Sequence, residues 1–313
     1  MFRLPAALRK LLLPLNTNTN KTVSANKVQA LYADVRRAFL GSVAREIQHQ
    51  SRSQRQKTLD KKRVKILNVE IDNIDALDFL RQLKHGVVFT PNVDHVMKLQ
   101  EDEEFVQAYR RADYKVCDSQ ILMYASKFLG TPLKAKISGS DLLPMFCQHH
   151  QHNEAIKIFM LGGAEGVAER ARQNINAKLG REIIIQAHSP SFGFEQNKME
   201  CQEILEQIKH SGANVLVVGV GAPKQEKWIA QYRDCLPNID IFLAVGAAID
   251  FEAGNKPRAP RYISELGFEW LYRLLSEPNR LWKRYLLRDM PFVWMILQAR
   301  FMQTKLEREQ QPS

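Results

Sequence analysis

The sequence predicts an α/β protein with a mostly parallel sheet flanked by helices. From residue 64 to about residue 254, short runs rich in β-branched and aromatic residues alternate with longer amphipathic segments. This alternation is typical of parallel strands joined by right-handed helical crossovers. The 313 residues are 45% hydrophobic and 25% charged, which is the composition of a globular protein. We therefore expect a Rossmann-like core, with a helical C-terminal appendage and a basic N-terminal extension.

The expected elements follow one another in a regular order. The strand-like runs are Val64–Val69, Val87–Phe89, Tyr114–Val116, Ile156–Leu161, Ile183–Gln186, Val215–Val218 and Ile239–Val245. The helical segments include Asp94–Arg111, Ser119–Phe128, Asp141–Gln151, Ala164–Leu179 and Pro223–Arg233. Parallel strands need a crossover of roughly a dozen residues or more, so the helical segments between the strands favour parallel pairing.

Charge and helix breakers divide the chain into three expected regions. Residues 1–63 hold 14 Lys and Arg against three Asp and Glu, whereas the remaining 250 residues hold 31 of each sign. We expect residues 1–63 to be a basic extension, partly helical or disordered, that is either a plain tail or a segment that binds anionic lipid. Residues 64–254 are the expected α/β core. Residues 255–313 are the expected helical appendage, broken at Pro278 and Pro291 because proline interrupts a helix.

Several classes of protein are disfavoured by this sequence. No apolar run approaches the ~20 residues of a membrane-spanning helix. The apolar stretch 4–15 is interrupted by Arg9 and Lys10, so we predict no secretory signal. The four cysteines are scattered without a C-x-x-C pair, so we expect neither a disulfide framework nor a zinc site. A reducing cytoplasm fits this cysteine usage best.

Two groups of residues are candidates for binding a metal ion. His149, His150 and His152 cluster at the polar end of a predicted helix, where a solvated helix terminus is the simpler explanation. The acidic pair Asp250 and Glu252 resembles those that hold divalent cations, but such a pair is common by chance. We therefore predict no metal site.

Candidate site residues follow the predicted strands, because ligands of open α/β sheets bind beyond the carboxyl ends of the strands. Small residues, amides, a hydroxyl and carboxylates occur there, in Thr90-Pro91-Asn92, Asp118-Ser119, Gly162-Gly163, Gly219 to Gln225, and Gly246 to Asp250. Asn92 and the pair Asp118-Ser119 are also good helix N-caps, so capping is an alternative explanation for them.

Two glycine-rich turns favour a phosphate ligand. In the first, Gly162 and Gly163 follow a strand and open a helix, where backbone N–H groups and the helix dipole attract an anion. In the second, Gly219 to Pro223, glycines allow close backbone approach and Pro223 suits a first helical turn. Lys224 and Gln225 follow, and Gln225 supplies an amide to a ligand. Strand-to-helix packing is the alternative, but it does not require the sequence Lys-Gln-Glu.

Basic and aromatic residues are interleaved in the C-terminal third. Arg280, Arg284 and Arg288 recur every four residues, with aromatic residues roughly opposite them. Such a helix either docks on the core by its aromatic side or lies in a membrane interface, where Trp and Tyr partition and Arg meets lipid phosphate. Nearer the core, Arg258 and Arg261 are candidates for binding a diphosphate, because the guanidinium fork binds phosphate in a bidentate manner.

These and neighbouring motifs follow one another in a single order along the chain. They are Thr90-Pro91-Asn92-Val93-Asp94, Val116-Cys117-Asp118-Ser119, Ser138-Gly139-Ser140-Asp141-Leu142-Leu143, Leu161-Gly162-Gly163, Val218 to Glu226, Gly246 to Phe251, Arg258-Ala259-Pro260, Leu266 to Leu274, and Glu277-Pro278. Together they resemble the bacterial WecG/TagA/CpsF family of glycosyltransferases over about residues 64–290. One position departs from the family pattern, because the family usually has Gly after the aspartate, where this chain has Ser119.

The resemblance implies an inverting enzyme that takes a hexose or N-acetylhexosamine-type sugar from a UDP-sugar. The implied acceptor is an undecaprenyl-diphosphate-linked saccharide, used in exopolysaccharide, teichoic acid or common antigen synthesis. The resemblance also implies a metal-independent enzyme without a cofactor, attached peripherally to an anionic membrane surface at the cytoplasmic face. Its C-terminal appendage would help to complete the active site. Whether the enzyme forms a homo-oligomer stays open.

The resemblance also suggests roles for individual residues. Asp118 is the expected catalytic base, Thr90 and Asn92 would position sugars, and Gln225 with its glycine-rich turn would contact the donor. Arg258, Arg261 or Arg273 would neutralise the diphosphate. The other expected substrate-binding residues are Asp141, Gly162, Gly163, Gly219, Gly221, Pro223, Lys224 and Asp250.

Two other functions are alternatives. An NAD-dependent oxidoreductase needs G-x-G-x-x-G after its first strand, whereas Val64–Val69 is followed by Glu70-Ile71-Asp72-Asn73. A nucleic-acid-binding protein would use the basic extension, and truncation of residues 1–63 with salt-dependent binding to DNA and to anionic vesicles would separate that role from lipid binding. We predict sugar transfer and no nucleic-acid partner.

Overall fold

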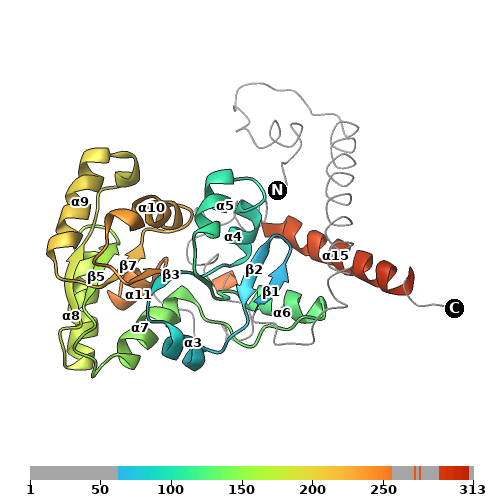
Figure 1. The fold of residues 1–313 in the computed structure, drawn as a ribbon, viewed down its shortest axis with the longest axis horizontal. Coiled ribbons are helices and arrows are strands. Elements are labelled where there is room, and N and C mark those ends of the chain that lie inside the picture. Colours follow the sequence, from blue (N-terminus) through green and yellow to red (C-terminus); the bar gives the residue numbers. More distant parts are fainter. Residues whose placement is uncertain (1–62, 256–270, 273–274, 276–288, 310–313) are drawn as a thin grey trace. The chain divides into compact units, whose positions relative to one another are not determined.

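The structure is a computed structural model that describes residues 63–255, 271–272, 275 and 289–309 (Figure 1). The chain divides into two compact units, Lys61–Pro291 and Met1–Asp60 with Phe292–Ser313, and each is described by itself. Almost all of the predicted basic extension lies outside the described residues, and so does most of the stretch 256–288.

The core of the first unit is a parallel sheet with the strand order β4-β3-β8-β7-β5-β6. Every pair of neighbouring strands in it is parallel. The strands are β3 (Gly86–Phe89), β4 (Tyr114–Lys115), β5 (Ile158–Gly162), β6 (Ile184–His188), β7 (Val215–Gly219) and β8 (Ile241–Ala244). The predicted mostly parallel α/β sheet is thus confirmed. The central strands are buried on both faces, which explains their uninterrupted apolar runs.

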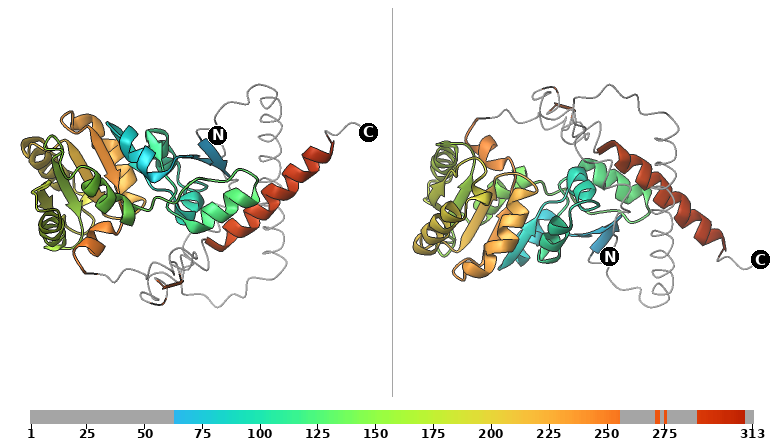
Figure 2. Two further views of the ribbon diagram at one scale, coloured as in Figure 1. Left: turned by 90° about the horizontal axis from the view of Figure 1, so that it is seen from below. Right: turned by 90° about the horizontal axis from the view of Figure 1, so that it is seen from above.

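Helices cover both faces of this sheet (Figures 1 and 2). The helices of this unit are α3 (Ala76–Gln82), α4 (Val93–Lys98), α5 (Glu103–Arg110), α6 (Gln120–Phe128), α7 (Gly139–His149), α8 (Val167–Leu179), α9 (Lys198–His210), α10 (Lys224–Tyr232) and α11 (Ala248–Glu252). Of these, α6 lies against the strand β1 (Arg63–Ile66), outside this sheet. Right-handed crossovers place α4, α5, α9 and α10 on one face and α7 and α8 on the other. Contacts between α5 and α10, and of α11 with α7 and α8, agree with this arrangement.

The strand order creates a topological switch between β5 and β7. The connection after β5 leads to β6 at the edge of the sheet, whereas the connection after β7 leads the other way, to β8. The two connections therefore leave the sheet on opposite faces. Ligands of open α/β sheets bind at such a point.

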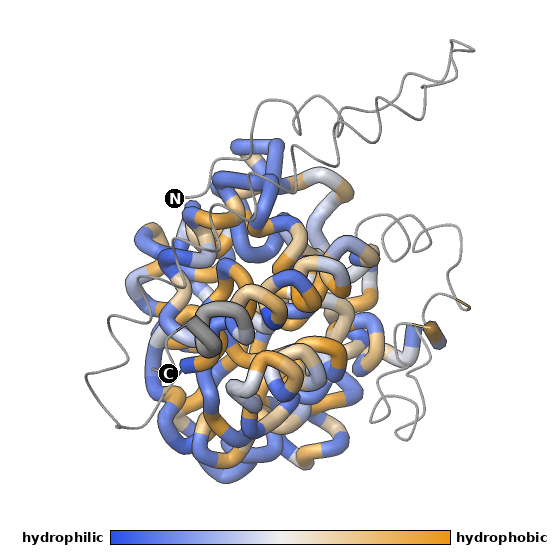
Figure 3. The backbone as a smooth tube through the Cα atoms, turned by 90° about the vertical axis from the view of Figure 1, so that its right-hand side faces the viewer, coloured by the Kyte–Doolittle hydropathy of each residue, from blue (hydrophilic) through white to orange (hydrophobic). Residues whose placement is uncertain are grey.

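The hydrophobic core lies on both sides of the sheet. Its largest fully buried side chains include Phe79, Phe89, Phe105, Phe146, Phe159 and Trp228. Hydrophobic and hydrophilic stretches alternate along the backbone tube (Figure 3), as expected of buried strands joined by helices that bury one side. Burial of these side chains, at ~1.5–3 kcal/mol each, holds the helices onto the strands.

The first predicted strand, Val64–Val69, is wrong as a single element. The chain forms an antiparallel hairpin there, β1 (Arg63–Ile66) and β2 (Val69–Asp72), which is a separate two-stranded sheet. Its tight turn places Leu67 at φ 53°, in the left-handed region that a non-glycine residue rarely adopts. The turn has no glycine or proline to mark it. The alternating apolar pattern continues across the turn and therefore predicts one strand.

The predicted helix Asp94–Arg111 is also wrong as a continuous element, because it is α4 followed by α5. The Asp102 side chain accepts a hydrogen bond from the Phe105 N–H at 3.0 Å and begins the second helix. Helix α4 ends at Lys98 with Leu99 as its C-cap, and Asp102 takes the extended backbone of an N-cap residue, so the two helices are separate. Helices α3, α9 and α11 are not among the predicted segments.

Most of the described part of the C-terminal appendage is the helix α15 (Met290–Glu309). Pro291 lies in its first turn, where the missing N–H has no intrahelical partner to lose. The predicted break at Pro291 is therefore the beginning of a helix, and the one at Pro278 lies outside the described residues. Among the described helices, none combines the length and the apolar character needed to span a membrane.

We predict that Gly162→Ala destabilises the core more than Gly180→Ala does. Both glycines have positive φ, so each alanine adds ~1–2 kcal/mol of backbone strain. A Cβ at Gly162 would also lie 2.5 Å from the Gly219 carbonyl oxygen, whereas a Cβ at Gly180 would meet nothing within 4 Å. The clash adds ~1–3 kcal/mol in urea-induced unfolding of the Gly162 variant. Equal losses for the two variants would contradict the close approach.

Candidate active site

The loops that follow β3 and β4 are joined by their backbones. The Asp118 N–H donates to the Pro91 carbonyl oxygen at 2.8 Å, and the Asp118 side chain is half-buried rather than sealed in the interior. The hydroxyl of Thr90 is buried and donates to the Ala244 carbonyl oxygen of β8 at 3.4 Å. Three neighbouring strand ends are thereby held together, and they bring Thr90, Asn92 and Asp118 to one edge of the sheet.

Helix capping explains two of the polar residues at this edge. The Asn92 side-chain oxygen accepts from the His95 N–H at 3.2 Å and caps α4, and the Ser119 hydroxyl accepts from the Leu122 N–H at 3.3 Å and caps α6. The capping alternative is thus confirmed for both. Asp118 precedes the cap of α6, so its carboxylate is not used in this way.

Glycines end the two strands at the topological switch and bring their backbones together. A Cβ at Gly219, the last residue of β7, would lie 2.8 Å from the Gly246 carbonyl oxygen, and the Gly163 N–H approaches the Gly219 carbonyl oxygen at 3.4 Å. Gly221 and Gly246 have positive φ, and an added Cβ at either would meet nothing within 4 Å. We call Gly162, Gly219, Gly221 and Gly246 the glycine shelf. Its surface is backbone, so a ligand can approach it closely.

The turn after β5 leads into α8 with a glycine at the N-cap. Gly166 has φ 73° and no side chain to accept the first N–H groups of the helix. One of these, the Ala168 N–H, donates to the Ser189 hydroxyl at 3.3 Å. The start of α8 is therefore a partly satisfied helix N-terminus beside Gly163, which agrees with the predicted geometry of this turn.

Gln225 lies beneath the glycine shelf rather than on its surface. It is 2% exposed, and its side-chain oxygen accepts from the N–H groups of Gly221 at 3.3 Å and Gly246 at 3.1 Å. Its Nε2 donates to the Glu226 carboxylate at 2.7 Å. The sequence predicts that the Gln225 amide contacts the sugar donor, but both its oxygen and its nitrogen form hydrogen bonds inside the protein.

A buried polar cluster that the sequence motifs do not predict lies between α4, α5 and α10. Asp94 pairs with Lys98 on α4, and the His95 ring lies 2.6 Å from the Tyr109 hydroxyl. Burial raises the pKa of Tyr109 well above its usual value, and three carboxylates raise this pKa further. In order of effect, they belong to Glu226, Asp118 and Asp94. The cluster therefore extends from the interior to Asp118.

Glu226 is the fully buried carboxyl of this cluster. Burial raises its pKa to about 7, against the opposing effects of the Gln225 hydrogen bond and the Lys98 charge. The group thus titrates near neutral pH. The motifs Thr90 to Asp94 and Val218 to Glu226 contain Asp94 and Glu226, but nothing in their spacing indicates burial.

The remaining predicted residues lie at several places. Lys224 makes an ion pair with Glu195 at 2.6 Å and lies 4.7 Å above the exposed ring of Phe192, so it bridges the loops after β6 and β7.

Asp141 accepts from the Ser138 hydroxyl at 2.6 Å, at the start of α7. Asp250 is half-buried on α11. Pro223 is the N-cap residue of α10. The predicted residues Arg258, Arg261 and Arg273 lie outside the described residues.

The histidine cluster differs from the expected solvated terminus in one residue. His149 and His152 are exposed, but His150 is buried beside Phe146, and burial lowers its pKa to about 4. Within the described ranges, no three His, Cys, Asp or Glu side chains gather as metal ligands would.

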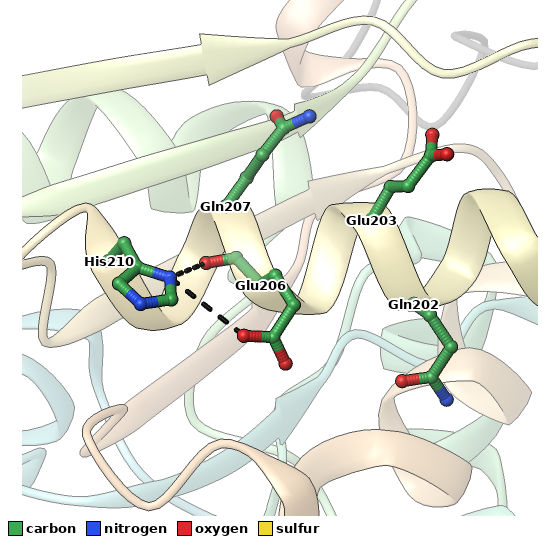
Figure 4. Close-up of a pocket in the computed structure, with 5 residues that line it drawn as sticks. All are labelled: Gln202, Glu203, Glu206, Gln207 and His210. Atoms are coloured by element: carbon green, nitrogen blue, oxygen red, sulfur yellow. Dashed lines mark hydrogen bonds and ion pairs between the residues drawn. The ribbon is translucent and has the colours of Figure 1, made fainter.

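A shallow surface hollow lies along α9 and away from the strand ends already described (Figure 4). Its lining residues are Gln202, Glu203, Glu206, Gln207 and His210. His210 Nδ1 lies 2.8 Å from the Glu206 carbonyl oxygen and 3.8 Å from its carboxylate. These are contacts within one exposed helix face, so we do not place the active site there.

Comparison with known proteins matches the chain to one family. The model of the "Glycosyl transferase WecG/TagA/CpsF family" matches residues 64–306, from β1 into α15. The chain belongs to this family. The identification made from the sequence motifs is therefore confirmed, and this WecG/TagA/CpsF family member is a glycosyltransferase. Family membership also decides against the oxidoreductase alternative.

Relatives of this family member include enzymes of Staphylococcus aureus named N-acetylglucosaminyldiphosphoundecaprenol N-acetyl-beta-D-mannosaminyltransferase. Those of strains MW2, NCTC 8325 / PS 47 and COL are each 27% identical to this chain over 252 residues. The similarity covers 76% of this chain and 93% of each relative. It therefore takes in nearly the whole length of those proteins.

We predict that Glu226→Gln changes how stability depends on pH. A carboxyl with a pKa of about 7 when folded and 4.5 when unfolded destabilises the fold increasingly as the pH rises, because the fold must bury the charged form. The wild type should lose roughly 2–3 kcal/mol relative to the variant between pH 5 and pH 8, as measured by urea unfolding. Glu154→Gln, which alters an exposed carboxyl, should follow the wild type. Parallel curves for wild type and Glu226→Gln would contradict the burial of the charge.

Proposed function

We propose that the protein transfers a hexose or N-acetylhexosamine-type sugar from a UDP-sugar to an undecaprenyl-diphosphate-linked saccharide, with inversion. The proposal is supported by membership of the family and by relatives whose name describes N-acetylmannosaminyl transfer to such a lipid. The product would enter a bacterial surface polysaccharide such as exopolysaccharide, teichoic acid or common antigen. The observation that carries the proposal is the position of Asp118 at the strand ends, bonded to the β3 loop.

Asp118 is the proposed catalytic base. Its half-buried carboxylate takes the proton of the acceptor hydroxyl while that oxygen attacks the anomeric carbon from the face opposite UDP. The bond from the oxygen to the anomeric carbon forms, the bond from that carbon to the phosphate oxygen breaks, and UDP leaves with the electron pair. One attack from the opposite face inverts the configuration. The weakly basic diphosphate needs charge stabilisation rather than a protonating acid.

The glycine shelf is the proposed donor side of the site. Its backbone lets a diphosphate approach closely, and the cation of Lys224 lies next to it in the chain. Strand β7 is three strand positions from β4, about 14 Å at the usual strand spacing, so an extended nucleotide sugar can reach from the shelf toward Asp118. Gly162 and Gly163 belong to the same surface, and Asp141 and Asp250 stay proposed substrate contacts.

Thr90 and Asn92 are the proposed positioning residues for the sugars. The helix-cap hydrogen bond uses the side-chain oxygen of Asn92, and its Nδ2 is the atom that would donate to the sugar. The Thr90 hydroxyl holds the loop after β3 against β8. Arg258, Arg261 or Arg273 would neutralise the leaving diphosphate, as their place in the family motifs suggests.

Peripheral attachment to an anionic membrane surface is the proposed means of reaching a lipid-linked acceptor. On α15, five large apolar side chains recur at the spacing of one helical face and are exposed, among them Trp294 at 56%. They are Met290, Val293, Trp294, Leu297 and Phe301. An apolar helix face with an interfacial Trp suits the boundary between headgroups and acyl chains.

We predict that Asp118→Asn lowers kcat by about 100- to 10,000-fold, because the amide keeps the shape and loses the basicity. The assay measures UDP release from UDP-N-acetylmannosamine, UDP-N-acetylglucosamine and UDP-glucose with a short-chain lipid diphosphate saccharide, with and without EDTA. UDP binding by calorimetry should be unchanged in the variant.

Three results would count against the proposed function. The first is near-wild-type turnover of Asp118→Asn, which would remove the base. The second is wild-type UDP release that requires a divalent cation. The third is the absence of release with every sugar tested.

We predict that Trp294→Ala weakens binding to phosphatidylcholine vesicles that contain phosphatidylglycerol by about tenfold or more, since it removes one large apolar side chain from the interface. Vesicle co-sedimentation measures this. Leu77→Ala is the matched control, because Leu77 is 62% exposed on α3. Equal binding of the wild type and Trp294→Ala would contradict attachment through this face.

A further inference from the structure

Two loops of the glycine shelf are tied to one side-chain atom. The Gln225 Oε1 accepts from the N–H of Gly221, in the loop after β7, and from the N–H of Gly246, in the loop after β8. Neither glycine offers a side chain that could hold its loop in place. A backbone surface made of glycines therefore takes part of its shape from Gln225.

Gln225 is in turn oriented by Glu226. The amide group of a glutamine can rotate by half a turn, which would exchange its oxygen with its nitrogen and point N–H groups at the N–H groups of Gly221 and Gly246. The hydrogen bond from Gln225 Nε2 to Glu226 Oε1 at 2.7 Å fixes the orientation that accepts from the glycines. A buried acceptor beside the amide is thus needed for this arrangement.

Glu226 itself is held among charged and polar groups of three helices. On α4, the carboxylate of Asp94 and the ammonium of Lys98 act on it, and from α5 the Tyr109 hydroxyl faces the same region. Gln225 faces it from its own helix. The second carboxylate oxygen of Glu226 has no hydrogen-bond partner among the described residues. A carboxyl that is 0% exposed and half satisfied is costly to the fold, so packing alone does not account for it.

We propose that Glu226 is a positioning residue for the donor, which acts through Gln225 to hold the β7 and β8 loops of the glycine shelf at a fixed spacing. The inference rests on the proposed function, because it takes the shelf as the donor side of the site. Glu226 touches no substrate in this arrangement. Its effect is on the backbone that receives the diphosphate.

The first test compares Glu226→Ala with Glu226→Gln. The alanine removes the acceptor that orients Gln225, so the KM for the UDP-sugar should rise by about tenfold or more while kcat changes little. The glutamine keeps an oxygen that can accept from Gln225 Nε2, so it should restore a KM near that of the wild type. Trp228→Phe perturbs the packing of the same helix without touching the hydrogen bonds, and is the matched control.

The second test exchanges the two side chains. In Q225E, two carboxyl groups face each other at the 2.7 Å contact and can pair only by sharing a proton. Its donor KM should therefore rise more steeply than that of the wild type as the pH goes from 6 to 8.5, with Asp94, Lys98 and Tyr109 as the other titratable groups that face the pair. The double variant Q225E/E226Q restores a donor and an acceptor and should lose this dependence.

A third measurement does not depend on activity. Amide hydrogen exchange at Gly221 and Gly246 should be faster in Glu226→Ala than in the wild type, and near the wild-type rate in Glu226→Gln. If the wild type released no UDP from any donor, the proposed function would fail, and the exchange rates would still decide whether Glu226 holds these loops.

The proposal is overturned by any of three results. One is unchanged exchange at both glycines in Glu226→Ala. Another is a rise in KM in Trp228→Phe equal to that in Glu226→Ala, which would indicate general loosening of α10. The last is a double variant Q225E/E226Q that behaves like Q225E alone.

Discussion

The close approach of backbones at the carboxyl ends of β5, β7 and β8 is the constraint on which the rest of the structure depends. A Cβ at Gly162 or Gly219 would lie less than 3 Å from a carbonyl oxygen of the neighbouring strand end. The strands can therefore converge there only without side chains. The same absence of side chains leaves a surface of peptide groups at the topological switch, where the connections to α8 and α10 leave opposite faces of the sheet.

Glycines have no side chains that could fix the loops of the glycine shelf in place. The polar groups beneath the shelf fix these loops by hydrogen bonds instead. Gln225 joins the loops after β7 and β8, and the Asp118 N–H joins the loop after β4 to that after β3. Burying Gln225 and Glu226 costs free energy that an apolar pair would not. The fold tolerates this cost beside the proposed donor side of the site, as expected where function and stability compete.

Much of the fold could be predicted because the strands and most helices carry their own signals. Buried parallel strands such as β7 appear as unbroken apolar runs, and side-chain caps such as Ser119 mark helix starts. Prediction failed where the local signal was weak or ambiguous. The hairpin turn at Leu67 has no glycine, and Asp102 sits in an acidic run that also suits a helix interior.

The sequence by itself determined the family, the order of the strands along the chain, and the set of residues at their carboxyl ends, because motifs and periodicity are local properties. Only the tertiary structure decided which of those residues are buried and which reach the surface. Gln225 follows a glycine-rich turn that suggests a ligand contact, yet it is buried and both polar atoms of its amide are hydrogen-bonded. The buried carboxyl of Glu226 arises from α4, α5 and α10 packing together, and no window of sequence contains those three helices.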